Sequence, residues 1–206
     1  MNGTIHLTVN LPNVLTSIRL VLSPVLAVLF LYDSLLSRYL VLIIVLFSEL
    51  TDLADGYMAR KRGQVTDFGK LLDPMADSLY RDTIFLSLAV IHQVSLFLVL
   101  PILYRDSIIA TLRTVCAYKG IVVAARWSGK IKAVLQGVVI ITILILRIWA
   151  SYNATVDFYL YRIANLLLGI ACAVTLYSAF DYLKNLIPEI LEKHDPPRSP
   201  EGELVG

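Results

Sequence analysis

Long apolar runs separated by short polar breaks dominate the pattern of this chain. Six such runs can be traced, at about residues 13–32, 39–61, 68–92, 96–118, 133–149 and 158–187. A helix needs about 20 apolar residues to cross a hydrocarbon core of roughly 30 Å. The runs lack the period-two alternation that is typical of membrane strands. The pattern therefore predicts an all-α integral membrane protein with six transmembrane helices.

The segments outside these runs complete the predicted organisation. Residues 1–12 alternate weakly between apolar and polar side chains, which indicates a short interfacial segment before the six-helix domain of residues 13–187. Residues 188–206 are rich in proline and charge, so we expect a mobile cytoplasmic tail. The N-terminus lacks the basic-then-apolar order of a cleavable signal peptide, and Met1 is predicted to begin the mature chain.

Composition and charge agree with this picture and add an orientation. The chain is 57% hydrophobic and only 17% charged, against about 25% charged in a soluble domain. A net charge of +2 gives no indication of nucleic-acid binding. Lysines and arginines gather in the breaks at 60–70 and 119–132, so the positive-inside rule places these breaks and both termini in the cytoplasm. The predicted location is the cytoplasmic (inner) membrane, with the active site facing the cytoplasm.

One acidic stretch, residues 51–77, interrupts the apolar pattern. Asp52 and Asp55 lie three residues apart, and Asp73 and Asp77 lie four apart, so each pair projects from one helix face. An unpaired ionised carboxylate at membrane depth costs at least several kcal/mol, which a bound divalent cation removes. Ligands that are all oxygen favour Mg²⁺, Mn²⁺ or Ca²⁺ over zinc. Four carboxylates can hold two such ions, the arrangement that assists phosphoryl transfer.

Small residues and an arginine accompany the acids. Gly56, Ala59 and Gly69 lie on the same helix faces and leave room for a ligand, while Arg60 offers a bidentate donor to a phosphate oxygen. Small residues on membrane helices more commonly serve helix packing, and charged pairs at the end of a span are commonly just solvated. The combination of four acids, glycines and an arginine favours a metal–phosphate site over both readings.

The complete spacing is Asp52-x2-Asp55-Gly56-x2-Ala59-Arg60-x8-Gly69-x3-Asp73-x3-Asp77. It resembles in full the signature of the CDP-alcohol phosphotransferases, membrane enzymes that move a substituted phosphate from a CDP-linked donor to an alcohol. The resemblance implies a six-helix fold, two divalent cations (Mg²⁺ or Mn²⁺), CMP as the leaving group and a homodimer.

The resemblance also implies roles for individual residues. One ion would be held by Asp52, Asp55 and Asp73, and the other by Asp52, Asp73 and Asp77. Asp77 would be the catalytic base that accepts the proton of the acceptor hydroxyl. The cytidine would be bordered by Gly56, Ala59 and Gly69, with Arg60 near the diphosphate.

Within the family, residues 10–136 are most similar to the bacterial phosphatidylglycerophosphate synthases, which implies CDP-diacylglycerol as donor and glycerol 3-phosphate as acceptor. An acceptor that is a phosphodianion requires cations. The available set is Arg105, Arg113, Lys130 and Lys132. The two arginines lie about two turns apart inside an apolar span, where an idle arginine is expensive. The positive-inside rule explains the two lysines almost as well as acceptor binding does.

Two alternatives remain open at this point. Ser78 stands where the phosphatidylglycerophosphate synthases usually have lysine, so a sibling transferase that uses inositol phosphate, serine or another alcohol shares every motif aspartate. A divalent-cation transporter would also place acids inside the membrane.

Glu49, one turn before Asp52, is predicted to pair with a nearby arginine rather than to bind metal. Cys116 and Cys172 lie in apolar segments and are predicted to be core residues.

Overall fold

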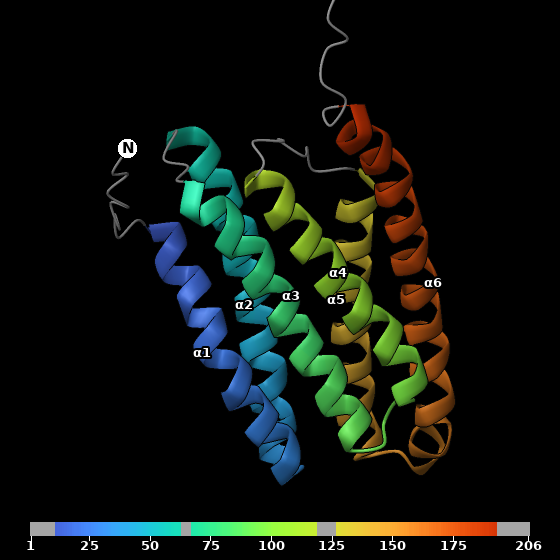
Figure 1. The fold of residues 1–206 in the computed structure, drawn as a ribbon. Helices are drawn as coiled ribbons and strands as arrows, with labels where there is room; N and C mark the ends of the chain where they lie inside the picture. Colours follow the sequence, from blue (N-terminus) through green and yellow to red (C-terminus); the bar gives the residue numbers. More distant parts are fainter. Residues whose placement is uncertain (1–10, 63–66, 119–126, 193–206) are drawn as a thin grey trace, which may run out of the picture.

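The structure, a computed structural model, describes the backbone of residues 11–62, 67–118 and 127–192 and the side chains of residues 17–51, 75–116 and 127–186. These ranges form helices and contain no strand (Figure 1). The helices are α1 (Leu11–Tyr32), α2 (Leu35–Arg62), α3 (Asp67–Val90), α4 (Leu96–Tyr118), α5 (Trp127–Ala150) and α6 (Ala154–Glu192). The prediction of an all-α fold is confirmed. The interfacial segment at 1–12 lies almost entirely outside the described residues, as does most of the tail.

Two helix boundaries differ clearly from the predicted ones. The fifth helix begins at Trp127, inside the predicted basic loop and about six residues before the predicted start. The sixth helix continues to Glu192 through Pro188, whereas the sequence pattern predicted an end near Ile187. Proline inside a helix removes one hydrogen bond and is usually costly, which is why the pattern predicted an end there. The residues that follow it, Glu-Ile-Leu-Glu, include strong helix formers. At 39 residues α6 is about 58 Å long, well beyond the thickness of a hydrocarbon core.

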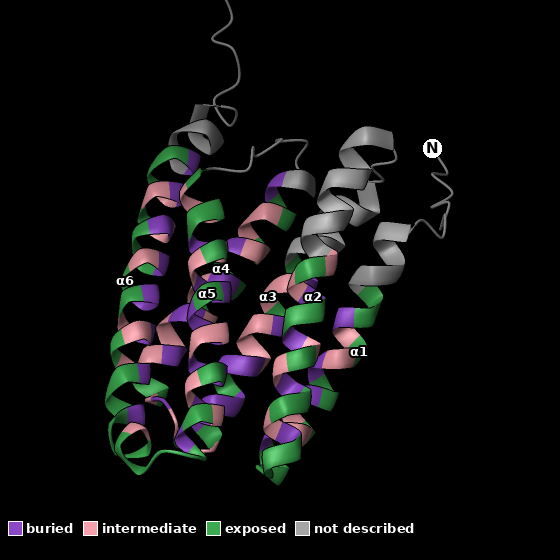
Figure 2. Ribbon diagram, turned by 180° about the vertical axis from the view of Figure 1, so that it is seen from behind, coloured by how far each residue is buried: buried purple, intermediate pink, exposed green. Residues whose placement is uncertain are grey.

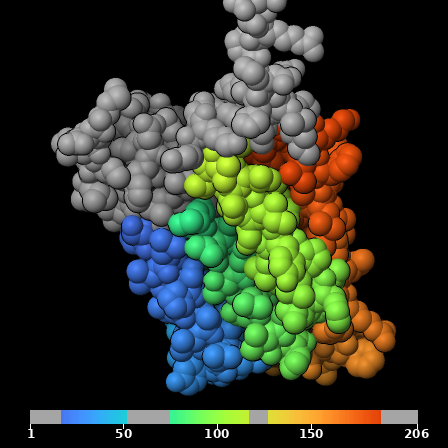
Figure 3. Space-filling model, viewed as in Figure 1, coloured from blue at the N-terminus to red at the C-terminus, as the bar shows by residue number. Residues whose placement is uncertain are grey.

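The helices form a closed ring of neighbours. Contacts run from α1 to α3, α4, α6, α5, α2 and back to α1, and a further contact between α3 and α5 crosses the ring. Figure 3 shows α1, α3 and α4 side by side on one face of the molecule. The helix α3, which carries two of the motif aspartates, therefore touches α1, α4 and α5, and α5 likewise touches three neighbours.

Two apolar clusters hold the ring together. The larger one joins all six helices through side chains such as Phe30, Phe85, Ile102, Ile140 and Leu168, each at most 1% exposed. The smaller one joins α4 to α6 and consists of Ile109, Cys116, Tyr182 and Leu186. Both cysteines are free thiols and buried, as predicted.

The outward faces of the helices are also apolar. Figure 2 shows exposed positions along the outside of the bundle, and large hydrophobic side chains stand there on every helix: Val21, Phe47, Leu79, Phe97, Val134 and Leu166 among them. Soluble monomers rarely expose apolar surface this widely. Among the described residues, α5 and the stretch Ala154–Leu186 of α6 are long and apolar enough to cross a membrane. Membrane association is supported, while six transmembrane spans remain a prediction.

Figure 1 shows that α1 begins, α2 ends, α3 begins and α6 ends at one end of the bundle, which we call the motif end because the motif aspartates lie on the helix segments there. The opposite end holds the short turns between α1 and α2, α3 and α4, and α5 and α6. Asp33 and His92 turn the chain there with φ angles of 35° and 57°, a left-handed conformation that aspartate and histidine tolerate better than most residues.

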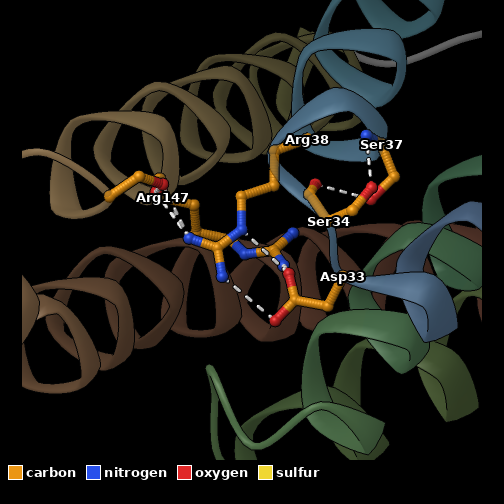
Figure 4. A network of polar contacts seen from close by, with 6 residues as sticks. Asp33, Ser34, Ser37, Arg38 and Arg147 are labelled. Atoms are coloured by element: carbon orange, nitrogen blue, oxygen red, sulfur yellow. Dashed lines mark hydrogen bonds and ion pairs between the residues drawn. The ribbon is translucent and has the colours of Figure 1, made fainter.

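At that opposite end Asp33 joins two arginines (Figure 4). Its carboxylate accepts two hydrogen bonds from Arg38, at 2.9 and 3.1 Å, and one from Arg147 at 2.6 Å. Arg147 is 2% exposed, and its guanidinium lies 5.2 Å from the centre of the Phe30 ring. Arg38 also donates to the Arg147 carbonyl oxygen at 3.1 Å. A single carboxylate thus fastens the α1–α2 turn to the end of α5.

We expect Asp33→Asn to lower the free energy of unfolding by about 1–3 kcal/mol, because the buried Arg147 guanidinium loses its counter-charge. Thermal unfolding in detergent measures this change. The matched control is Arg162→Gln, which removes a charge from an exposed position on α6 and should change stability by less than about 0.5 kcal/mol. Equal stability of Asp33→Asn and the wild type would show that this carboxylate does not fasten the turn.

Candidate active site

The two pairs of motif aspartates lie at the facing ends of two successive helices. Asp52 and Asp55 lie about 15 and 10 Å before the end of α2, at 1.5 Å per residue. Asp73 and Asp77 lie about 9 and 15 Å after the start of α3. Both helix ends lie at the motif end (Figure 1).

Most side chains of the motif lie outside the described residues. These are Asp52, Asp55, Gly56, Ala59, Arg60, Gly69 and Asp73. Within the side chains that the structure does describe, no three histidine, cysteine, aspartate or glutamate residues gather as a metal site. The predicted metal ligands and donor-binding residues therefore stay a prediction, apart from the surroundings of Asp77.

Asp77 is held by an arginine from the first helix. The Nη1 atom of Arg19 donates a hydrogen bond to Oδ1 of Asp77 at 2.5 Å. The side chain of Arg19 is 8% exposed and that of Asp77 is 24% exposed, so the pair is largely shielded from solvent. The carboxylate of Asp77 thus occupies a place where it requires a cation, which fits the chemistry of a divalent-ion ligand.

Glu49 is paired as predicted. Its Oε1 atom lies 3.7 Å from Nε of Arg81, which is one turn after Asp77 on α3. A side chain on Gly137 of α5 would begin 3.3 Å from Oε2 of Glu49, so glycine at this position leaves room for the carboxylate. The Glu49 charge is therefore compensated within the bundle, and the prediction that Glu49 has an arginine partner is confirmed.

The structure divides the four predicted acceptor cations into two groups. Arg105 and Lys132 form the inner group and converge on Asp106. Lys132 Nζ donates to both carboxylate oxygens, at 2.6 and 2.7 Å, and Arg105 Nη1 donates to Oδ1 at 3.0 Å. The other guanidinium nitrogen of Arg105, Nη2, donates to Ser178 Oγ on α6 at 2.9 Å. These cations are buried and ordered by hydrogen bonds from α4, α5 and α6.

The outer group consists of Arg113 and Lys130. The guanidinium of Arg113 lies 6.0 Å from the centre of the Tyr182 ring. Lys130 is exposed, with Nζ 4.8 Å from the centre of the Trp127 ring. Each makes a cation–π contact near the end of α4 or the start of α5, closer to the motif end than the inner group is. The four predicted cations therefore consist of one pair at depth and one pair nearer the motif end.

Two charged residues outside the predicted site have central positions. Arg19 contacts Asp77, and Asp106 joins Arg105 to Lys132. Both lie within apolar spans, so the cost of a charge inside a membrane helix is the signal that identifies them. The same criterion selected Arg105 and Arg113, and applied to every charged residue of the spans it would have included these two.

Comparison with known proteins identifies the family to which this chain belongs. The family model for CDP-alcohol phosphatidyltransferase matches residues 9–177, which include the whole aspartate motif, helices α1 to α5 and the first part of α6. This chain belongs to the CDP-alcohol phosphatidyltransferase family. It is therefore a transferase, and the resemblance read from the motif is confirmed.

Several curated relatives share one description, CDP-diacylglycerol–glycerol-3-phosphate 3-phosphatidyltransferase. The Treponema pallidum (strain Nichols) protein is 36% identical over 146 residues, covering 69% of this chain and 68% of its own. The Rickettsia typhi (strain ATCC VR-144 / Wilmington) protein is 34% identical over 175 residues, covering 85% and 96%. The Escherichia coli (strain K12) protein is 30% identical over 190 residues, covering 89% and 98%. Membership of a transferase family removes the support for a divalent-cation transporter.

The contact between Arg19 and Asp77 can be tested with a double-mutant cycle in the metal-free protein. We expect the unfolding free energies of Arg19→Gln and Asp77→Asn to be non-additive by about 0.5–3 kcal/mol, because either change alone leaves a shielded charge without its partner. Unfolding in detergent with a chelator measures the cycle.

The control cycle combines Arg19→Gln with Asp33→Asn, about 21 Å away along α1. These two changes should add within about 0.5 kcal/mol. Additivity of the Arg19 and Asp77 variants would mean that the ion pair contributes nothing to the folded protein.

Proposed function

We propose that this protein transfers the phosphatidyl group of CDP-diacylglycerol to glycerol 3-phosphate, giving phosphatidylglycerophosphate and CMP. The observation that carries the proposal is the complete aspartate motif inside the family match, with one aspartate pair near the end of α2 and the other near the start of α3. The shared description of the relatives supports the choice of donor and acceptor.

Two divalent cations, Mg²⁺ or Mn²⁺, are part of the proposal. Asp52, Asp55 and Asp73 would hold one, and Asp52, Asp73 and Asp77 the other. When bound, such ions neutralise charge on phosphate oxygens and make a nearby hydroxyl more acidic. The oxygen-only donor set and the shielded, cation-paired position of Asp77 fit hard divalent ions.

The chain's own residues then have distinct tasks. The oxygen of the acceptor hydroxyl forms a bond to the β-phosphorus of the donor, the bond from that phosphorus to the CMP oxygen breaks, and Asp77 takes the hydroxyl proton. Arg60 would bind the diphosphate, and Gly56, Ala59 and Gly69 would leave room for the cytidine. Arg19 donates a hydrogen bond to Asp77 and thereby orients its carboxylate.

The acceptor's phosphate requires donors beyond the metal ligands. We assign this task to Arg105 and Lys132, which are buried and already oriented, with Arg113 and Lys130 nearer the motif end. A guanidinium and an ammonium held by a common carboxylate give a phosphate two fixed directions of hydrogen bonding. The separation into an inner and an outer pair suits a charged ligand that enters from the cytoplasm.

The bundle also suits a lipid donor. Its outward faces are apolar on every helix, so the acyl chains can remain in the bilayer while the diphosphate reaches the motif end. We propose six membrane spans, with the motif end, both termini and the active site at the cytoplasmic side of the inner membrane. Assembly as a homodimer in the lipid is part of the same proposal.

The alternative acceptor is another alcohol, because Ser78 stands where the phosphatidylglycerophosphate synthases usually have lysine. Measuring CMP release with a panel of acceptor alcohols decides between the two. We expect purified protein with CDP-diacylglycerol and Mg²⁺ to release CMP with glycerol 3-phosphate. It should release at most a few per cent as much with serine, which has no phosphate for Arg105 and Lys132, or with inositol phosphate, whose ring is much bulkier than glycerol. Product from another alcohol without product from glycerol 3-phosphate would overturn the acceptor assignment.

The assignment of Asp77 predicts that Asp77→Asn lowers turnover by about 10²–10⁴-fold, the range typical of a lost general base. Steady-state CMP release measures the loss, and binding of CDP-diacylglycerol and Mn²⁺ is measured alongside it. The control is Asp157→Asn, an exposed acid in the first turn of α6 at the opposite end. An Asp77→Asn protein that binds donor and ions and turns over normally would exclude Asp77 as the base.

A further inference from the structure

A buried polar network joins α4, α5 and α6 around Asp106. The Asp106 side chain is 1% exposed, that of Lys132 is 6% exposed and that of Arg105 is 9% exposed. Ser178, which receives the hydrogen bond from Arg105, is 1% exposed. Charges are rarely buried to this degree unless their partners are well placed. The network therefore has one geometry in which all three charges are compensated, and Asp106 is its centre.

Asp106 leaves part of each cation's hydrogen-bonding capacity unused. Lys132 has three N–H donors, and two hydrogen bonds to the carboxylate leave one. Arg105 uses Nη1 for Asp106 and Nη2 for Ser178, while its Nε is buried without a hydrogen-bond partner. Two cations share one carboxylate, so the three groups together carry a single positive charge. Arg105 and Lys132 therefore have donors available for an anion, and Asp106 fixes the positions of both side chains.

The network lies against the helix that carries Asp77. Asp82 follows Asp77 by five residues on α3, and its carboxylate is close enough to interact electrostatically with both Asp106 and Lys132. The Oδ1 atom of Asp82 is buried and has no hydrogen-bond partner. The network therefore lies against α3, on a different side of that helix from Asp77, with unused donor and acceptor atoms at Arg105 and Asp82.

We propose that Asp106 is a positioning residue for the acceptor. It does not touch the reacting atoms, and it holds Arg105 and Lys132 so that their remaining donors meet the phosphate of the acceptor. The inference rests on the proposed function, since it takes the acceptor to be a phosphate-bearing alcohol. Asp106 therefore determines affinity for the acceptor and leaves affinity for the CDP-linked donor unchanged.

The test is a comparison of Michaelis constants in Asp106→Asn. The asparagine keeps the size of the side chain but removes the charge that orders both cations. We expect the KM for glycerol 3-phosphate to rise about 10- to 100-fold, the effect of losing hydrogen bonds between charged groups. The KM for CDP-diacylglycerol should stay within about twofold. Asp106→Glu, which retains the charge, should recover part of the acceptor affinity.

Asp33→Asn is the matched control, because Asp33 also joins two arginines across helices, but at the opposite end of the bundle. It should lower stability without changing either KM. If Asp106→Asn does not fold, Ser178→Ala removes only the partner of Arg105 Nη2, and a rise of about threefold or more in the acceptor KM is expected.

The possible results separate the two claims. Wild-type protein that releases no CMP with glycerol 3-phosphate overturns the proposed function and this inference with it. Wild-type activity together with an unchanged acceptor KM in the Asp106 and Ser178 variants overturns the inference alone. A parallel rise in both Michaelis constants assigns Asp106 a purely structural role and also overturns it.

Discussion

The cost of placing charge inside an apolar bundle is the constraint on which this structure depends. Charged groups within the helices are compensated by partners from other helices: Arg19 by Asp77, Arg81 by Glu49, and Lys132 by Asp106, which also pairs with its own neighbour Arg105. Removing one partner of such a pair is far more damaging than replacing both by apolar groups. The pairs therefore fix the register of the helices, and α1, α2, α4 and α5 are each joined to the bundle by at least one of them.

The cost of burying charge also determines where the proposed site can lie. In the proposed function, divalent ions would compensate the four aspartates of α2 and α3, and the acceptor's phosphate would meet the cations beyond them. One end of the bundle thus collects the groups that a CDP-linked donor and a phosphate-bearing acceptor need. The opposite end uses an analogous arrangement, Asp33 with Arg38 and Arg147, to hold turns together. Asp33 and Asp106 have similar partners, but we propose different roles for them because only the Asp106 network interacts with α3.

Much of this could be predicted from the sequence. The apolar runs predicted six helices with boundaries close to those observed, and the spacing from Asp52 to Asp77 was enough to indicate the family. Glu49 was predicted to have an arginine partner, and Arg81 is that partner. The continuation of α6 through Pro188 was missed because local helix-forming residues outweighed the proline. The grouping of Arg105 with Lys132 through Asp106 depends on how α4 packs beside α5 and α6, and spacing within one helix carries no information about such contacts.

The central claim is that one site has two separable halves, with aspartates and Arg60 for the donor and the buried cations for the acceptor. The most direct measurement is the pair of Michaelis constants in Arg105→Gln, determined by CMP release in detergent with saturating Mg²⁺. The account predicts that the KM for glycerol 3-phosphate rises about 10-fold or more while the KM for CDP-diacylglycerol does not change. An unchanged acceptor KM, or a rise confined to the donor, would contradict it.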